Sequence, residues 1–149
     1  MINKPEALMN DKELLNLFTD MVRAHTAYID RQLASLGLSN GQGGVISVLG
    51  RYGSLTQNEL ARFRQVTPAT ISIMLDRMER DGLVSRFTAK DNSRANNVRL
   101  TQKGEALYTE LDSLMAGEPA LVFEGLTQEE KDLAADIFRK ITENDQKKD

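Results

Sequence analysis

Hydrophobic residues recur at helical spacing along the first quarter of the chain. From position 11 to position 36 they return every three or four residues, which places them on one stripe of a helix of about seven turns. The stripe consists of Leu14, Leu15, Phe18, Met21, Val22, Ile29, Leu33 and Leu36. A helix of this length is more than a small domain needs to fill its own core, so we expect part of the stripe to pack against a second copy of the chain.

Start and stop signals predict a second, shorter helix. Gly37 is typical of a residue that ends a helix. Ser39, followed by Gln42 three residues later, forms a capping box and predicts the next helix start. The apolar residues between positions 45 and 49 give this helix a buried face, and Gly53 predicts its end.

Two further helices are predicted in close succession. Thr56 and Glu59 form a capping box before a short helix. Thr67 is an N-cap residue, and Pro68 takes the first helical position, where its missing N–H and fixed φ cost least. Gly82 predicts the end of that helix through a left-handed turn.

A β-hairpin is predicted to follow the fourth helix. Positions 83–88 are predicted as a short strand and 98–100 as its return, with 89–97 as a polar connection that protrudes. Two short helices joined by a brief turn, with the second followed by a hairpin, are typical of a winged helix-turn-helix. The expected fold is therefore mainly α with a small β-hairpin.

The remainder of the chain is predicted to be helical. Thr101 restarts a helix, and a capping box from Thr127 to Glu130 begins another. Their apolar faces comprise Leu107, Tyr108, Leu111, Leu114 and Met115 in the first, and Leu133, Ile137, Phe138 and Ile141 in the second. The charged tail from Asn144 to Asp149 is expected to fray.

Charge is distributed unevenly along the chain. The formal net charge is −3, but the stretch 50–104 holds ten basic and five acidic residues, a net of +5, and the flanks carry −8. A basic middle on an acidic scaffold can present one face to a polyanion, although the asymmetry could also be incidental surface. The chain has no cysteine and no apolar run or leader of the kind that targets a membrane, so we expect a cytoplasmic protein that does not enter a membrane.

The residues needed for common catalytic and metal sites are missing. His25 is the single histidine, and no cysteine is present to accompany it, so zinc sites and Cys-His nucleophile pairs cannot be assembled. The glycine cluster 41–44 lacks the preceding strand and the spacing of a phosphate-binding loop. We therefore predict no catalytic residue, no metal and no cofactor.

The helix that begins at Thr67 is suited to DNA. The second helix of a helix-turn-helix enters the major groove by its N-terminal end, where side chains must be short and polar. Ile73, on the outer face, can contact a thymine methyl, and Arg77 can reach a phosphate or a guanine edge. The candidate DNA contacts are Gln57, Thr67, Pro68, Ala69, Thr70, Ser72, Ile73, Arg77, Arg94 and Asn96. Arg94, at the hairpin tip, has the length to enter a minor groove. The alternatives are a capped surface helix and an arginine with no function in its loop.

Three segments carry a family resemblance. They read LTQNELA from Leu55, VTPATISIMLDRMERDGLVSR from Val66, and DNSRANNVRLTQKG from Asp91. With the long first helix and the C-terminal helices, the chain 1–149 resembles a single domain of the MarR family of bacterial transcription regulators. The resemblance implies a homodimer held by helical regions 11–36 and 102–145, with the winged helix-turn-helix at 39–100.

The resemblance also implies a mode of action. Two winged helices would bind a pseudo-palindromic operator on double-stranded DNA, and a small aromatic or phenolic effector would bind between the two regions. For that effector the fold suggests a pocket near His25, Tyr28 and Ile46. We expect a dimeric, sequence-specific repressor relieved by a small ligand. The alternative is a winged-helix module that binds another protein, since fold alone does not dictate function.

Overall fold

The computed structural model describes residues 9–88 and 96–147. The chain divides into two compact units, Met1–Leu114 and Met115–Asp149. Each unit is described by itself.

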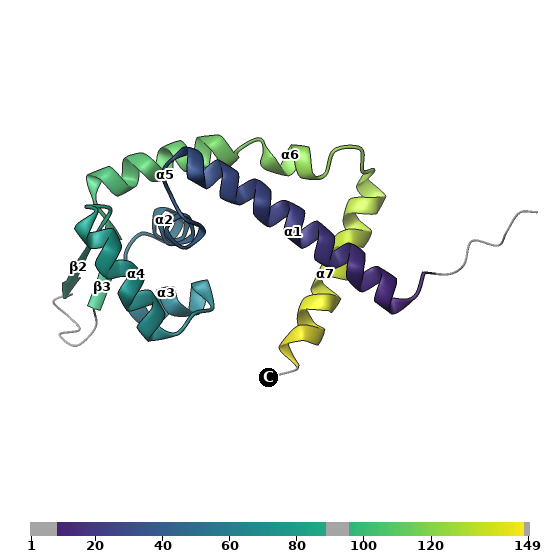
Figure 1. Ribbon diagram of the computed structural model, residues 1–149, viewed down its shortest axis with the longest axis horizontal. Coiled ribbons are helices and arrows are strands. Elements are labelled where there is room, and N and C mark those ends of the chain that lie inside the picture. Colours follow the sequence, from purple (N-terminus) through teal and green to yellow (C-terminus); the bar gives the residue numbers. More distant parts are fainter. Residues whose placement is uncertain (1–8, 89–95, 148–149) are drawn as a thin grey trace, which may run out of the picture. The chain divides into compact units, whose positions relative to one another are not determined.

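The first unit begins with two helices, α1 (Asp11–Ser35) and α2 (Asn40–Tyr52), labelled in Figure 1. Ser39 caps α2 as predicted: its side chain accepts from the backbone N–H of Gln42, whose side chain accepts from the N–H of Ser39. A Cβ added at Gly43 would lie 2.3 Å from a methyl of Leu33. Gly43 therefore permits the close packing of α2 on α1, whereas Gly41 faces Met74 of α4 and Gly44 faces Arg64 of α3.

Helices α3 (Gln57–Arg64) and α4 (Pro68–Arg80) follow as predicted. Gln65, the C-cap of α3, adopts a left-handed conformation with φ 51°, which makes the turn between the two helices short. Gly82, with φ 73°, ends α4 in the conformation that favours glycine. The core of this part is apolar and fully enclosed, and includes Ile46, Leu49, Leu60, Ile71, Leu75 and Met78.

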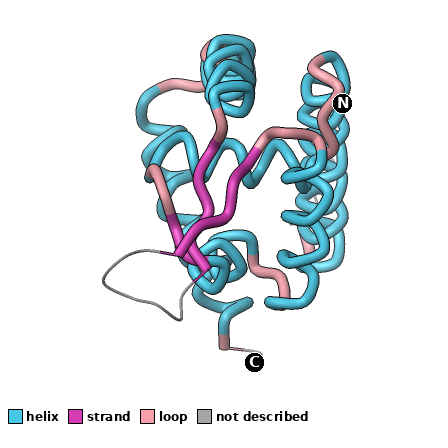
Figure 2. The backbone as a smooth tube through the Cα atoms, turned by 90° about the vertical axis from the view of Figure 1, so that its left-hand side faces the viewer, coloured by secondary structure: helices cyan, strands magenta, loops and turns pink. Residues whose placement is uncertain are grey.

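A small antiparallel sheet completes the winged helix-turn-helix (magenta in Figure 2). Its strands are β1 (Leu55–Thr56), β2 (Val84–Thr88) and β3 (Asn96–Leu100), in the order β1-β3-β2. Three details differ from the sequence prediction, the smallest being that β2 begins at Val84 rather than at Leu83. The two-residue strand β1 was not predicted, and β3 begins at Asn96 rather than at Val98, because Asn96 and Asn97 pair with Thr88 and Phe87.

The start of helix α5 (Gln102–Met115) is hydrogen-bonded to the residues that follow α4. The hydroxyl of Thr101 donates to the carbonyl of Gly82 at 2.5 Å, and the ammonium of Lys103 donates to the carbonyl of Asp81 at 2.8 Å. A Cβ added at Gly104 would lie 2.1 Å from the carbonyl oxygen of Leu83. The start of α5 therefore lies directly against the backbone that links α4 to β2.

The second unit consists of α6 (Glu118–Val122) and α7 (Gln128–Gln146). Thr127 and Glu130 form the predicted capping box. The sequence did not predict α6, and α7 extends through Asn144, where fraying was expected. Neither helix contains a buried residue, and large apolar side chains are exposed on both, among them Leu121, Leu133, Ile137 and Phe138.

Candidate nucleic-acid interface

The N-terminus of α4 presents short polar side chains to solvent. Thr67, Pro68, Ala69 and Thr70 are all exposed. The hydroxyl of Thr67 accepts from the backbone N–H of Thr70 at 3.2 Å and lies 2.9 Å from the hydroxyl of Thr70. One of the two hydroxyl hydrogens makes that mutual bond. The other remains to donate outward, whichever threonine carries it.

The outer face of α4 continues with larger side chains. Ile73 is 57% exposed and points away from the buried stripe of Ile71 and Leu75, as the sequence predicted. Arg77 is exposed as well, and Ser72 is half-buried. A cation and an apolar side chain thus follow the polar first turn on the open side of the helix, an arrangement that can contact both phosphates and base edges.

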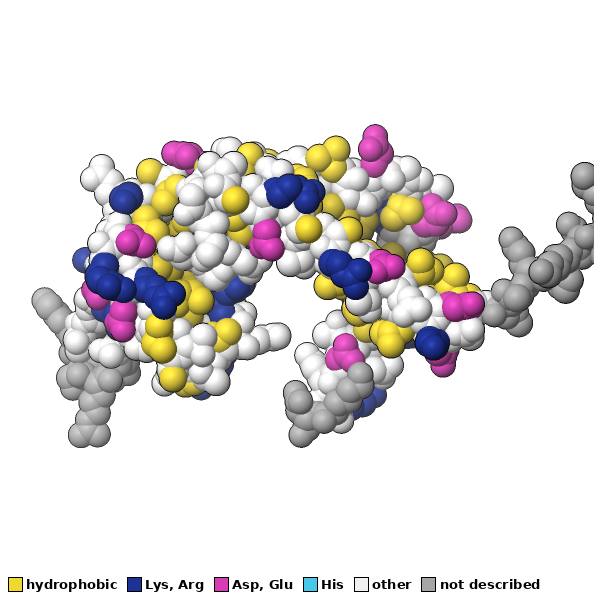
Figure 3. Space-filling model, in the orientation of Figure 1, with side chains coloured by type: hydrophobic (Ala, Val, Ile, Leu, Met, Phe, Trp, Pro, Cys, Tyr) yellow, Lys and Arg dark blue, Asp and Glu magenta, His cyan; other side chains and the backbone are white. Residues whose placement is uncertain are grey.

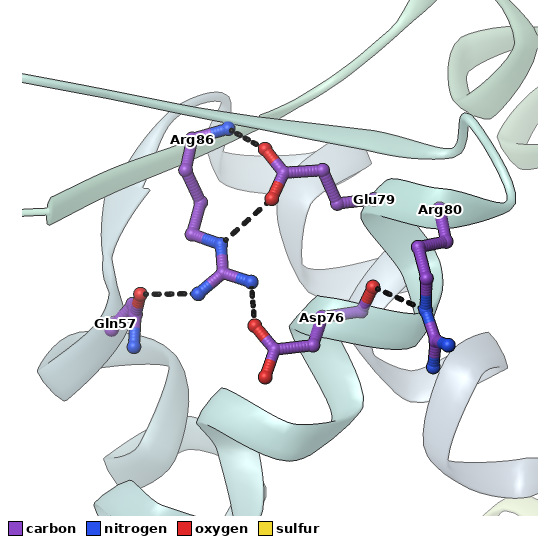
Figure 4. Close-up of polar contacts among 5 residues, drawn as sticks. All are labelled: Gln57, Asp76, Glu79, Arg80 and Arg86. Carbon is purple, nitrogen blue, oxygen red and sulfur yellow. Dashed lines mark hydrogen bonds and ion pairs between the residues drawn. The ribbon is translucent and has the colours of Figure 1, made fainter.

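One flank of α4 is held by an arginine from the hairpin (Figure 4). The guanidinium of Arg86 on β2 pairs with the carboxylates of Asp76 and Glu79, its Nε lying 3.3 Å from Oε2 of Glu79. Its Nη1 donates to Oε1 of Gln57 on α3 at 3.4 Å, and the other carboxylate oxygen of Glu79 accepts from the backbone N–H of Arg86. The side chain of Arg86 is only 20% exposed. It therefore ties α3, α4 and β2 together at one point.

This cluster was not predicted from the sequence. Asp76 and Glu79 lie one turn apart on the same helix, and Arg86 follows a few residues after the helix end. Two acids at that spacing, followed by a basic residue in the adjoining strand, were a detectable signal of an ion-pair network. The involvement of Gln57 was not readable, because it comes from a separate element.

The remaining predicted DNA contacts occupy different places. Gln57 is the first residue of α3 and is half-buried against Arg86. Asn96 is exposed at the start of β3 rather than in the connection. Arg94 lies outside the described residues.

The first turn of α3 carries its own electrostatic feature beside Gln57. The backbone N–H and the hydroxyl of Thr56 donate to Oε2 of Glu59 at 2.7 and 2.8 Å. These bonds stabilise the carboxylate and hold the pKa of Glu59 below its ordinary value. These bonds thereby fix the start of α3 at Thr56.

Basic side chains are visible over the α4 and hairpin end of the first unit (dark blue in Figure 3). In the described residues, Arg62, Arg77, Arg80, Arg99 and Lys103 are exposed there. Residues 9–88 and 96–147 contain no group of three histidine, cysteine or acidic side chains that could hold a metal ion. No helix in this part of the chain is long and apolar enough to cross a membrane.

The predicted effector residues do not share one environment. His25 on α1 is exposed, Tyr28 is half-buried, and Ile46 on α2 has no exposed surface. A separate cavity of about 430 Å³ lies between the end of α2, β3 and α5. It is lined among others by Leu49, Arg99 and Tyr108, whose ring packs against Gly50.

Comparisons with known proteins agree with this geometry. The MarR family profile matches residues 38–95, which span α2 to the hairpin. The chain is 31% identical to the HTH-type transcriptional repressor YetL of Bacillus subtilis (strain 168) over 134 residues, covering 86% of this chain and 80% of YetL. It is 30% identical to the HTH-type transcriptional repressor MdtR of the same organism, over 72% of this chain and 69% of MdtR.

A solved structure supports the same assignment. A MepR variant from S. aureus, bound to an oligodeoxyribonucleotide, superposes with a TM-score of 0.59 at 26% identity, covering 88% of this chain and 96% of the MepR chain. The winged helix-turn-helix, the polar start of α4 and the extent of the similarity to YetL and MdtR lead to one conclusion. The chain belongs to the MarR family of transcriptional regulators and is not an enzyme.

Proposed function

We propose that this protein is a repressor that binds operator DNA with α4 in the major groove. The observation that carries the proposal is the exposed first turn of α4, where Thr67, Ala69 and Thr70 leave room for the backbone to approach the bases. YetL and MdtR are both repressors, and the similar MepR chain is bound to an oligodeoxyribonucleotide.

Within this interface each side chain has a proposed role. Thr67, Pro68, Ala69, Thr70 and Ser72 form the close-approach surface, with hydroxyl donors for phosphates or base edges. Ile73 contacts a thymine methyl, and Arg77 a guanine edge or a phosphate. From the hairpin, Arg94 enters the minor groove and Asn96 contacts the backbone beside it.

The protein acts as a homodimer in this proposal. Large apolar side chains on α1 are exposed in the single chain, including Leu14, Leu15 and Met21. Those on α7, such as Leu133 and Phe138, are exposed as well. Exposed apolar surface on each of these helices would favour aggregation of a lone chain, whereas burial in a dimer stabilises it. Regions 11–36 and 102–145 would form the interface and place two copies of 39–100 on a pseudo-palindromic operator.

A small aromatic or phenolic effector would relieve repression. Its proposed contacts are His25, Tyr28 and Ile46, and because Ile46 is buried, binding would require α1 and α2 to separate locally. The cavity beside Tyr108 offers a second place of suitable size for a small molecule. A rise in Tm with added phenolic compounds, together with a loss of DNA affinity, would support an effector. A Tm and an affinity unchanged by such compounds would remove it from the proposal.

Salt-dependent binding to duplex DNA tests the proposal. Fluorescence anisotropy with a labelled duplex from the DNA upstream of the coding region measures the association constant K. A plot of log K against the logarithm of the salt concentration should fall linearly. A protein-binding module need not release counterions and would bind this duplex weakly or not at all. A flat salt dependence, or no preference for the upstream duplex over unrelated DNA, would contradict sequence-specific DNA binding.

A further inference from the structure

The Arg86 cluster fixes the orientation of a side chain at the edge of the proposed interface. Arginine carries only donors and no acceptor. The atom of the Gln57 amide that lies 3.4 Å from Nη1 of Arg86 must therefore be the oxygen, Oε1. The NH₂ group of Gln57 then points away from Arg86. Within the described residues, no hydrogen bond occupies it.

Through Arg86, the side chain of Gln57 is held near Asp76 on the exposed side of α4. Arg86 contacts Gln57 and Asp76 with different nitrogens of one guanidinium, so the two side chains lie on either side of it (Figure 4). Asp76 is exposed and lies on the open face of α4, one turn before Arg80. The free NH₂ of Gln57 is thus beside the flank of α4 that would meet the sugar-phosphate backbone.

Arg86 both neutralises negative charge on this flank of α4 and orients the amide of Gln57. Asp76 and Glu79 carry two negative charges on the helix that would approach a polyanion. Arg86 draws both carboxylates toward itself and neutralises one of the two charges. The same contact holds the amide of Gln57 with its donors outward.

We infer that Gln57 donates a hydrogen bond from its NH₂ group to a backbone phosphate of duplex DNA, and that Arg86 is the positioning residue that sets this orientation. The inference rests on the proposed DNA-binding function and adds a role, a ligand atom and a partner for Gln57. A phosphate contact carries no sequence information, so its contribution must be equal on operator and unrelated DNA.

Two substitutions at Gln57 remove the NH₂ donor while the length of the side chain is kept. The carboxylate introduced by Gln57→Glu can accept from Arg86 as the amide oxygen does, but it has no donor and it repels phosphate. Gln57→Met keeps the length and removes the donor without adding charge. We expect Tm within a few degrees of the parent for both. Affinity for operator and for unrelated duplex should fall about tenfold for Gln57→Met and further for Gln57→Glu, with the salt slope unchanged for Gln57→Met.

A matched control is available in the second unit. Gln146 is the exposed last residue of α7 and lies outside the regions proposed for DNA binding and dimerisation, so Gln146→Glu adds the same charge away from both. We expect its DNA affinity to stay within twofold of the parent. The positioning role is tested in an Arg86→Met background, where the amide is free to rotate. There the cost of Gln57→Met should shrink to about threefold or less.

Several results would overturn the inference. Parental affinity for Gln57→Glu would show that the amide donates nothing to DNA, and a large fall in Tm would show that its carboxylate does not pair with Arg86. A loss confined to the operator would assign Gln57 to a base edge, and an undiminished cost in the Arg86→Met background would remove the positioning role. If the parent itself binds duplex DNA without salt dependence, the proposed function fails before Gln57 is considered.

Discussion

Replacement of Gly104 by alanine should destabilise the protein although it improves the helix locally. The added Cβ would lie 2.1 Å from the carbonyl oxygen of Leu83, where ordinary contacts are 3.4 to 4 Å. That oxygen is a backbone atom, and it accepts from the N–H of Thr101 at 3.1 Å. Relief of the overlap therefore requires α5 to move away from the segment that joins α4 to β2.

The magnitude follows from two opposed effects. Alanine is favoured over glycine in a helix by up to about 1 kcal/mol. Overpacking of a well-packed site costs about 1 to 3 kcal/mol and occasionally more, and the rigid neighbour at Gly104 places this site at the upper end. We expect a net loss of about 2 kcal/mol. For a chain of this length that corresponds to a fall in Tm of about 4 to 8 °C.

Gly44→Ala on α2 provides the control. Its Cβ would meet the guanidinium of Arg64, with Cζ at 2.1 Å, which is the far end of a flexible side chain and can swing away. Helix propensity changes in the same direction at both sites, so Gly44→Ala should stay within about 1 kcal/mol of the parent. Thermal unfolding followed by circular dichroism at one fixed protein concentration compares them, since an associating protein has a concentration-dependent Tm. A Tm for Gly104→Ala equal to or above that of Gly44→Ala would refute the argument.

Four further predictions concern the interface, assembly and pH. Arg77→Ala should weaken operator binding by about 1 to 3 kcal/mol without a change in Tm, whereas Arg23→Ala, on exposed α1, should leave binding intact; parental affinity for Arg77→Ala would show that the arginine is idle. Light scattering at low micromolar concentration should give about twice 16.7 kDa, and a stable monomer would contradict the dimer. Arg94→Ala should lower affinity equally on operator and unrelated DNA and reduce the salt slope by about 1 per chain; an unchanged slope would exclude a phosphate contact. The stabilisation from the Glu59 carboxylate should be present above pH 4.5 and be lost as pH falls through its lowered pKa. The decrease in Tm on acidification should therefore be smaller for Glu59→Gln than for the parent, and an equal decrease would contradict this role.

Local signals in the sequence were sufficient for most of the helices. The cap at Ser39 and the one at Thr127 each act within four residues, so the chain around them specifies the helix start without help from the rest of the fold. Thr67 and Pro68 likewise start α4 as predicted. The resulting order of elements was enough to identify the winged helix-turn-helix.

Features that depend on distant residues were not predicted. Strand β1 is two residues long and exists because Leu55 and Thr56 pair with Val98 and Asn97, far along the chain. Asparagine is typical of turns, yet Asn97 lies in β3 because pairing on both sides outweighs its local preference. Strand assignment here is a tertiary effect, which a short sequence window does not contain.

The candidate interface divides in the same way. The exposed polar start of α4 could be predicted because capping and helical periodicity are local. In the Arg86 cluster the spacing of Asp76, Glu79 and Arg86 was a detectable signal, but the participation of Gln57 was not, because only the fold brings Gln57 and Asp76 to the same guanidinium. The packing role of the glycines on α2 was not predicted for the same reason: the side chains that press against them, such as Leu33 and Arg64, belong to other helices.

Footprinting on the DNA upstream of the coding region would show whether the protein binds a pseudo-palindromic operator as a dimer through α4. We expect two protected half-sites, related by an inverted repeat and with centres about one helical turn or a multiple of it apart. Protection at both half-sites should appear at the same protein concentration, because one dimer occupies both. Uniform protection without discrete half-sites, or none at concentrations that saturate unrelated DNA, would contradict this mode of binding.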